Sequence, residues 1–252
     1  MLHYKIDGQG EPIVLLHGLF GSLDNLGVIA RQLAQNYQVI SIDLPNHGRS
    51  EHIDSVSYTD MANRVHQCMT ELGIDRYSVV GHSMGGKVAM RMAHLFPDSI
   101  QKLAVLDMAP VAYTVARHTQ VLKALNAVVD AVPSSRSDAL KVMAQHLDDQ
   151  GVIQFLGKSL HKQDAGFGWR FNVATLEKEY WSILGWEQQA PNTLPTLMVI
   201  GGDSDYVQQQ HQAQIVAQFP AVKAHVISNA GHWLHAEKPQ QVARAIERFL
   251  SR

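Results

Sequence analysis

The chain has 252 residues, with 21 lysines and arginines against 23 aspartates and glutamates, so its formal net charge is −2. This balance argues against a nucleic-acid or anionic-membrane partner, because either would call for a basic surface. The single cysteine, Cys68, excludes an internal disulfide and a cysteine-based metal cluster. The hydrophobic share of 46% is typical of a globular protein.

No apolar run approaches the roughly 18 residues that span a bilayer. The first seven residues lack the charged region and the long apolar region of a signal peptide. We therefore expect a cytoplasmic protein that does not associate with membranes.

Short apolar runs, rich in β-branched residues and bounded by glycine or proline, predict buried strands. They lie at 13–16, 39–42, 78–80, 103–106, 197–200 and 225–227, and the amphipathic segment 2–7 is a candidate edge strand. Stretches with helical spacing, such as 58–72 and 239–250, separate them. Continuous apolar strands are covered on both faces, so we predict a mostly parallel, doubly wound α/β sheet of about seven or eight strands.

One segment interrupts this alternation. Residues 111–194 contain no convincing strand but show helical spacing at 121–129 and 139–147, followed by an aromatic cluster. Bare coil of this length is improbable. We predict a core made of residues 1–110 and 195–252 and a helical cap, 111–194, over the carboxyl ends of the strands, where α/β proteins bind ligands. A set of peripheral helices is the alternative.

The candidate nucleophile is Ser83, within the sequence Gly-His-Ser-Met-Gly at 81–85. A strand is predicted before this motif and a helix after it, the context that a nucleophile elbow requires. The turn raises the Ser83 hydroxyl above the sheet and places the Met84 N–H at a helix N-terminus, where it can stabilise an oxyanion. The alternative is a glycine-rich turn with an idle serine.

A serine hydroxyl needs a base, and enzymes with this motif carry their histidine near the end of the chain. His232 follows Gly231 after the last predicted strand, whereas His235 is expected to begin the turn into the final helix. A second oxyanion donor should come from the loop after an early strand, where we expect the N–H of Leu19, or less readily that of Phe20.

Several stretches resemble α/β-hydrolase-fold enzymes, and in particular the bacterial YbfF-type esterases. They are HGLFGSLDN at 17–25, GHSMGG at 81–86, DMAPV at 107–111, GVIQFL at 151–156, WRFNV at 169–173 and GHWLHAEKP at 231–239. The resemblance covers nearly the whole chain. It implies hydrolysis of a carboxyl ester or an acyl thioester, a small-molecule substrate, with no cofactor and no metal.

Two aspartates compete for the role of the acid that orients the histidine. Asp205 lies in a Gly-Asp-Ser-Asp loop after the strand at 197–200, where most α/β hydrolases carry their acid. Asp107 ends the strand at 103–106, an arrangement that the YbfF-type pattern resembles. A charge buried at the end of an apolar strand needs a partner, so we favour Asp107. Ser204 is a candidate auxiliary hydrogen-bond donor.

The expected chemistry is acyl transfer through Ser83, with His232 as base. Phe20, Trp169 and Phe171 are expected to line the acyl pocket, unless they form the core of the cap. The alternatives are a carbon–carbon bond hydrolase or lyase with the same site, or a ligand-binding protein without turnover. We expect a monomer or a homodimer.

Overall fold

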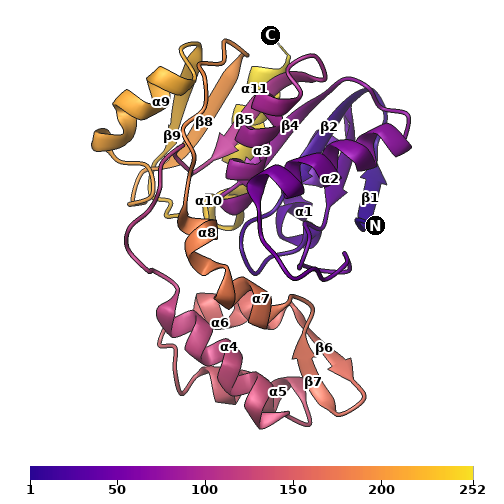
Figure 1. The fold of residues 1–252 in the computed structure, drawn as a ribbon, viewed down its shortest axis with the longest axis vertical. Coiled ribbons are helices and arrows are strands. Elements are labelled where there is room, and N and C mark those ends of the chain that lie inside the picture. The colour runs from indigo at the N-terminus through magenta and orange to yellow at the C-terminus, as the bar shows by residue number, and fades with distance from the viewer. Residues whose placement is uncertain (252) are drawn as a thin grey trace.

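A parallel sheet forms the centre of the computed structural model, which describes residues 1–251 (Figure 1). Seven strands lie in the order β1-β3-β2-β4-β5-β8-β9. Only β1 is antiparallel to its neighbour, β3. Their bounds are β1 Tyr4–Asp7, β2 Glu11–Leu16, β3 Tyr37–Ile42, β4 Tyr77–His82, β5 Ile100–Leu106, β8 Thr196–Gly201 and β9 Val222–Ile227. The predicted α/β class and the predicted strands, including the edge strand, are confirmed.

Helices cover both faces of the sheet because successive side chains of a strand point to opposite faces. Val14 and Leu16 of β2 pack toward α2 (Tyr58–Glu71) and α3 (Met84–Leu95). Ile13 and Leu15 pack toward α1 (Gly27–Leu33) and α11 (Pro239–Leu250) on the other face. Burial on both faces explains why these strands read as continuous apolar runs.

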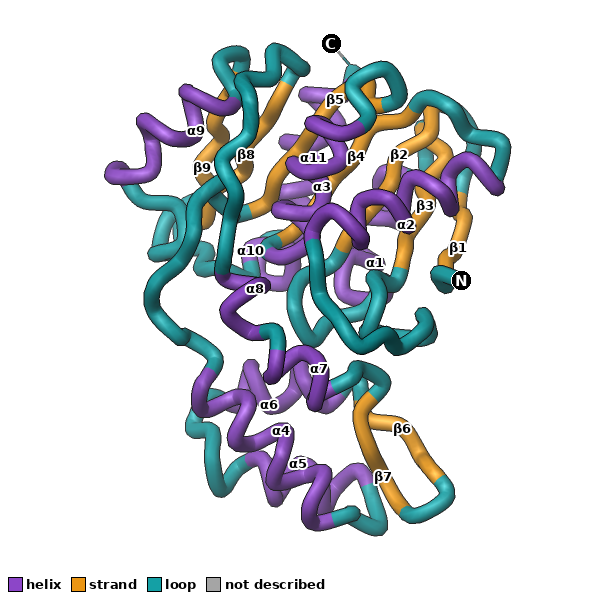
Figure 2. Tube along the Cα trace, viewed as in Figure 1, coloured by secondary structure: helices purple, strands orange, loops and turns teal. Residues whose placement is uncertain are grey.

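The insertion, as we call residues 111–194, leaves the sheet after β5 and returns before β8, and it lies beyond the edge where the parallel strands end (Figures 1 and 2). Five helices and a two-stranded hairpin form it. They are α4 Thr119–Ala131, α5 Arg136–Met143, α6 Gln150–Gly157, β6 Leu160–Gln163, β7 Gly166–Trp169, α7 Val173–Lys178 and α8 Tyr180–Leu184.

The expectation of no strand in the insertion is wrong. The β6–β7 hairpin has the sequences Leu-His-Lys-Gln and Gly-Phe-Gly-Trp, which are only four residues each and contain no apolar run. Its pairing depends on contacts that the local sequence does not indicate, because strand formation reflects packing more than intrinsic preference.

A buried lysine joins the end of the insertion to the sheet layers. The Lys87 ammonium on α3 donates to the carbonyls of Leu184 and Gly185, each at 2.8 Å. It also lies 5.0 Å from the centre of the Tyr113 ring and 5.6 Å from that of Tyr58. Burial lowers the pKa of Lys87 to about 7. Lys87 thus orients the chain as it returns from α8 toward β8.

Within residues 1–251, no helix is both long enough and apolar enough to cross a membrane. The remaining short elements are α9 Gln212–Gln218, α10 Leu234–Glu237 and two single turns of 3₁₀ helix at Leu23–Leu26 and Gln209–His211.

The packing of α3 against β2 generates a stability prediction. A methyl group at Gly85 would lie 2.4 Å from the His17 carbonyl oxygen and 2.5 Å from that of Leu16, so backbone would have to move. Gly85→Ala should therefore cost about 3 kcal/mol and lower the Tm by about 6 to 12 °C. Thermal unfolding followed by circular dichroism measures it.

The matched control is Gly27→Ala. Gly27 has helical backbone angles, and a methyl group there would lie 3.6 Å from the Arg31 guanidinium, an ordinary contact. Alanine favours a helix over glycine by roughly 0.5 to 1 kcal/mol, so this Tm should stay level or rise. Equal Tm values for the two variants would contradict the close contact.

Candidate active site

A strained turn between β4 and α3 presents the Ser83 side chain. Ser83 has φ of 53° and ψ of −119°, a backbone conformation that costs free energy in a residue with a side chain. Two glycines make the turn possible, because a methyl group at Gly81 would lie 2.1 Å from the Gly85 carbonyl oxygen. The side chain of Ser83 therefore stands above the carboxyl end of the sheet.

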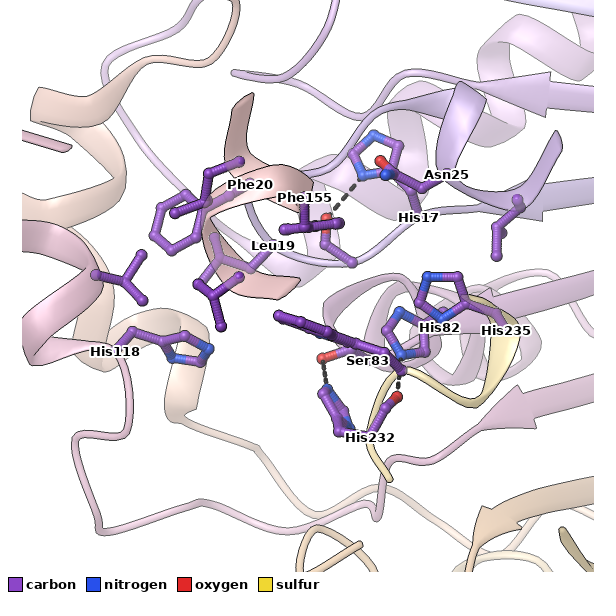
Figure 3. A pocket seen from close by; sticks show the side chains of 16 residues that line it. His17, Leu19, Phe20, Asn25, His82, Ser83, His118, Phe155, His232 and His235 are labelled. Atoms are coloured by element: carbon purple, nitrogen blue, oxygen red, sulfur yellow. Dashed lines mark hydrogen bonds between the residues drawn. The ribbon is translucent and has the colours of Figure 1, made fainter. Parts of the chain in front are cut away.

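Three side chains from separate loops meet at this turn. The Ser83 hydroxyl lies 2.9 Å from Nε2 of His232 (Figure 3), and Nδ1 of His232 lies 2.7 Å from Oδ2 of Asp107. Asp107 follows β5, and His232 lies between β9 and α10. If Nδ1–H donates to the carboxylate, Nε2 is left as the acceptor for the Ser83 hydroxyl proton.

The Asp107 carboxylate is buried, with 1% of its surface exposed, and its oxygens have additional donors. Oδ1 accepts the Gly201 N–H at 3.0 Å, and Oδ2 also accepts the Ser204 hydroxyl. A buried carboxylate needs such donors to offset the loss of water. The β8 loop thus holds the carboxylate in place for His232.

Asp205, the alternative acid, points elsewhere. Its carboxylate pairs with the Arg117 guanidinium, and 61% of its side chain is exposed. The hydrogen bond from Arg117 lowers the pKa of Asp205. Asp205 has no hydrogen bond to His232, so the structure brings Asp107 and not Asp205 to the histidine.

An aromatic ring covers one face of the histidine. Tyr206 stacks on His232 with ring centres 3.6 Å apart and planes inclined by 11°, and the Arg117 guanidinium lies 4.7 Å from the centre of the Tyr206 ring. The backbone of His232 is also held, since Nε2–H of His82 donates to its carbonyl at 2.9 Å. These contacts restrict the rotation of the imidazole.

The backbone of the loop after β2 passes beside Ser83. The Phe20 N–H donates to Nε2 of His47 at 3.2 Å, so it is already occupied. Among the described residues, no protein group accepts the N–H of Leu19 or that of Met84. Gly18 allows the loop to approach, since a methyl group there would lie 3.2 Å from Cβ of Ser83. The backbone N–H groups of Leu19 and Met84 therefore remain unpaired within residues 1–251.

A cavity of about 50 Å³ opens beside Ser83. Phe20 lines it, as expected, but Trp169 and Phe171 do not. These two rings stack on each other at 5.1 Å behind Phe20, and the Trp169 indole N–H donates to the Leu125 carbonyl. Their expected place in the pocket lining is therefore corrected to the core of the insertion. The insertion instead contributes His118, Val121, Val152, Phe155 and Leu156 to the lining.

Buried histidines surround the turn. Burial lowers the pKa of His17 and His118 to about 4 and that of His47 and His235 to about 3. His235 lies in α10, where its ring centre is 4.1 Å from that of His82, and it has no hydrogen bond to the Ser83 hydroxyl, which contacts His232 instead. In residues 1–251, no group of three or more His, Cys, Asp or Glu side chains is placed to hold a metal ion.

Tyr206 and His118 stand in no sequence motif that predicts a role at the site. Tyr206 directly follows Ser204 and Asp205, and this position next to the candidate acid is the one feature of the sequence that could have indicated a role. His118 lies in a polar stretch before α4, where no motif marks it.

The seven-stranded sheet, the strained serine turn and the Ser83–His232–Asp107 contacts define the α/β-hydrolase class of proteins. Comparison with known sequences agrees: the model of the Alpha/beta hydrolase family matches residues 13–245. The chain therefore belongs to the α/β hydrolase family.

Relatives across bacteria and animals share most of the chain. It is 46% identical to Esterase YbfF of Escherichia coli K12 over 96% of this chain and 94% of the relative. It is 37% identical to the sn-1-specific diacylglycerol lipase ABHD11 of Mus musculus over 98% of this chain and 83% of the relative. Among solved structures, a marine microorganism esterase superposes with a TM-score of 0.95 at 33% identity, covering 98% of both chains.

The buried histidines predict that stability depends on pH. Each has a folded-state pKa below the usual 6.5, so the unfolded chain takes up protons first as the pH falls. The free energy of unfolding should fall between pH 6.5 and 4, by up to about 1.4 kcal/mol per pH unit for each such histidine. Urea unfolding at pH 7.5, 6.5 and 5.5 measures this slope.

Two variants test the origin of the slope. His235→Phe keeps an aromatic ring but removes a buried titratable group, so it should flatten the pH dependence. His225→Asn changes an exposed histidine and should leave the slope as it is. A free energy of unfolding that does not change, or that increases, from pH 6.5 to 5.5 would contradict the prediction.

Proposed function

We propose that this protein hydrolyses small carboxyl esters or acyl thioesters through an acyl-enzyme on Ser83. The observation that carries the proposal is the 2.9 Å contact between the Ser83 hydroxyl and Nε2 of His232, with Asp107 2.7 Å behind the same ring. Relatives that are 46% and 37% identical over nearly the whole chain are named esterase and lipase, which supports ester hydrolysis.

The proposed cycle begins when His232 takes the Ser83 proton at Nε2 as the oxygen attacks the carbonyl carbon. The N–H groups of Leu19 and Met84 hold the oxyanion. When the intermediate collapses, His232 returns the proton to the departing alcohol or thiol. Water, deprotonated by His232, then attacks the acyl-enzyme and releases the acid. Asp107 keeps Nδ1 protonated and stabilises the imidazolium.

The other classes have less support. The carbon–carbon hydrolase alternative has only a fold-level likeness, a meta-cleavage product hydrolase from Pseudomonas fluorescens at 19% identity and a TM-score of 0.71. A ligand-binding role without turnover does not explain why three loops bring a serine, a histidine and a carboxylate into contact. We further propose that residues 111–194 act as a cap, that the protein works in the cytoplasm, and that it is a monomer or a homodimer.

Ser83 and the small cavity beside it predict which esters the protein hydrolyses fastest and what a serine variant does. One ordered water needs about 10 to 15 Å³, so a cavity of about 50 Å³ suits only a few atoms. Initial rates on p-nitrophenyl acetate and butyrate should exceed the rate on the octanoate. Ser83→Ala should lower kcat by about 10⁴-fold or more on each substrate. Equal turnover by the native protein and the variant would rule out Ser83 as nucleophile.

The contacts of the two aspartates predict unequal effects of their substitution. Asp107→Asn should lower kcat by about 10⁴-fold, because the amide no longer favours the Nδ1–H tautomer of His232. Asp205→Asn should change kcat by less than about tenfold, since it removes an exposed pair with Arg117. The matched pair is measured on p-nitrophenyl butyrate. The opposite order of effects would assign the acid to Asp205.

A further inference from the structure

His118 places a polar group in an otherwise apolar part of the cavity wall. It immediately precedes α4 in the insertion, and its ring faces Ser83 and His232 across the cavity (Figure 3). The other residues that the insertion contributes to the lining are Val121, Val152, Phe155 and Leu156. Within residues 1–251, His118 is thus the one polar side chain that the insertion presents to the cavity.

The contacts of Tyr180 determine which nitrogen of His118 carries the hydrogen. The Tyr180 phenol oxygen accepts the backbone N–H of His118 at 3.0 Å and lies 2.7 Å from Nδ1 of the same residue. The phenol hydrogen of Tyr180 has no other acceptor among the described residues, so we assign it as the donor to Nδ1. A neutral imidazole whose Nδ1 accepts carries its hydrogen on Nε2.

The ring is neutral at ordinary pH, since burial lowers the pKa of His118 to about 4. Its Nε2–H has no acceptor among the described residues. Its side chain is only partly buried and lines the cavity, so a bound ligand that offers an acceptor can take this hydrogen bond in place of water. The contact with Tyr180 therefore keeps the hydrogen of the neutral His118 ring on Nε2, at the cavity.

We propose that His118 is a specificity-determining residue that donates a hydrogen bond from Nε2–H to an oxygen atom of the substrate other than the reacting carbonyl. The class of substrate is an ester with an ether, hydroxyl or keto oxygen a few bonds from the ester group. This inference rests on the proposed function. Tyr180 is a positioning residue, because it acts through the tautomer of His118.

The test uses pairs of esters that differ only by an oxygen in place of a methylene group. On the acyl side, p-nitrophenyl methoxyacetate is compared with p-nitrophenyl butyrate. On the alcohol side, 2-methoxyethyl butyrate is compared with n-butyl butyrate by titration of the released acid. For each pair, kcat/KM of the oxygen-containing ester is divided by kcat/KM of its methylene counterpart. The readout is this ratio in the native protein divided by the same ratio in a variant. Intrinsic reactivity of the esters cancels in this double ratio.

Three variants of His118 separate the donor at the cavity from the contact with Tyr180. The amide oxygen of His118→Asn can replace Nδ1 toward Tyr180, but this variant has no group at the place of Nε2. The longer side chain of His118→Gln can place an amide N–H there. His118→Phe removes both and keeps a ring beside Phe20, whose centre lies 6.0 Å from that of His118.

We expect the double ratio for His118→Asn and His118→Phe to be about fivefold in one of the two arms, the size of one neutral hydrogen bond. His118→Gln should restore at least half of the loss, and the arm that responds identifies the side of the ester that His118 contacts. Tyr180→Phe should also give a double ratio above one in the same arm, although Tyr180 does not line the cavity.

Double ratios of one in both arms, with the native protein active and Ser83→Ala inactive, would overturn the role of His118 and leave the proposed function in place. An equal loss on both members of each pair would also overturn it, because that result indicates a structural role only. No turnover of any of the four esters by the native protein would overturn the proposed function and this inference together.

Discussion

The backbone of Ser83 is the constraint on which the rest of the site depends. A φ of 53° at a serine is unfavourable in isolation, and it persists because β4 and α3 are both buried in the sheet layers on either side of it. The close approach of Gly81 to Gly85 shortens the turn. The packing of the core therefore offsets the unfavourable conformational free energy of this turn. As a result, the Ser83 hydroxyl lies where α3 begins.

The parallel sheet then explains why distant residues meet. Strands β4, β5 and β8 are neighbours that end at the same edge, so the loops after them bring Ser83, Asp107 and Ser204 together. His232 enters from the loop after the next strand, β9. The spatial order of the strands differs from their order in the chain, and only the former determines which loops are adjacent.

The insertion contributes two polar side chains, Arg117 and His118, to the surroundings of the site. Arg117 lies over Tyr206, which stacks on His232, and His118 faces the same cavity. Lys87, buried against two carbonyls at the other end of the insertion, connects it to α3. The insertion is thus linked to both the histidine loop and the helix of the nucleophile.

The sequence by itself determined the α/β class, the seven strands of the main sheet and the candidate residues Ser83 and His232, because apolar runs and glycine-bounded turns are local signals. It favoured Asp107 but left Asp205 as a rival acid, since a loop position says nothing about where a carboxylate points. Only the tertiary structure paired Asp205 with Arg117, turned Trp169 and Phe171 into core, formed the β6–β7 hairpin and brought His118 to the cavity. Each of these outcomes depends on contacts between segments far apart in the chain, and such contacts leave no pattern in the local sequence.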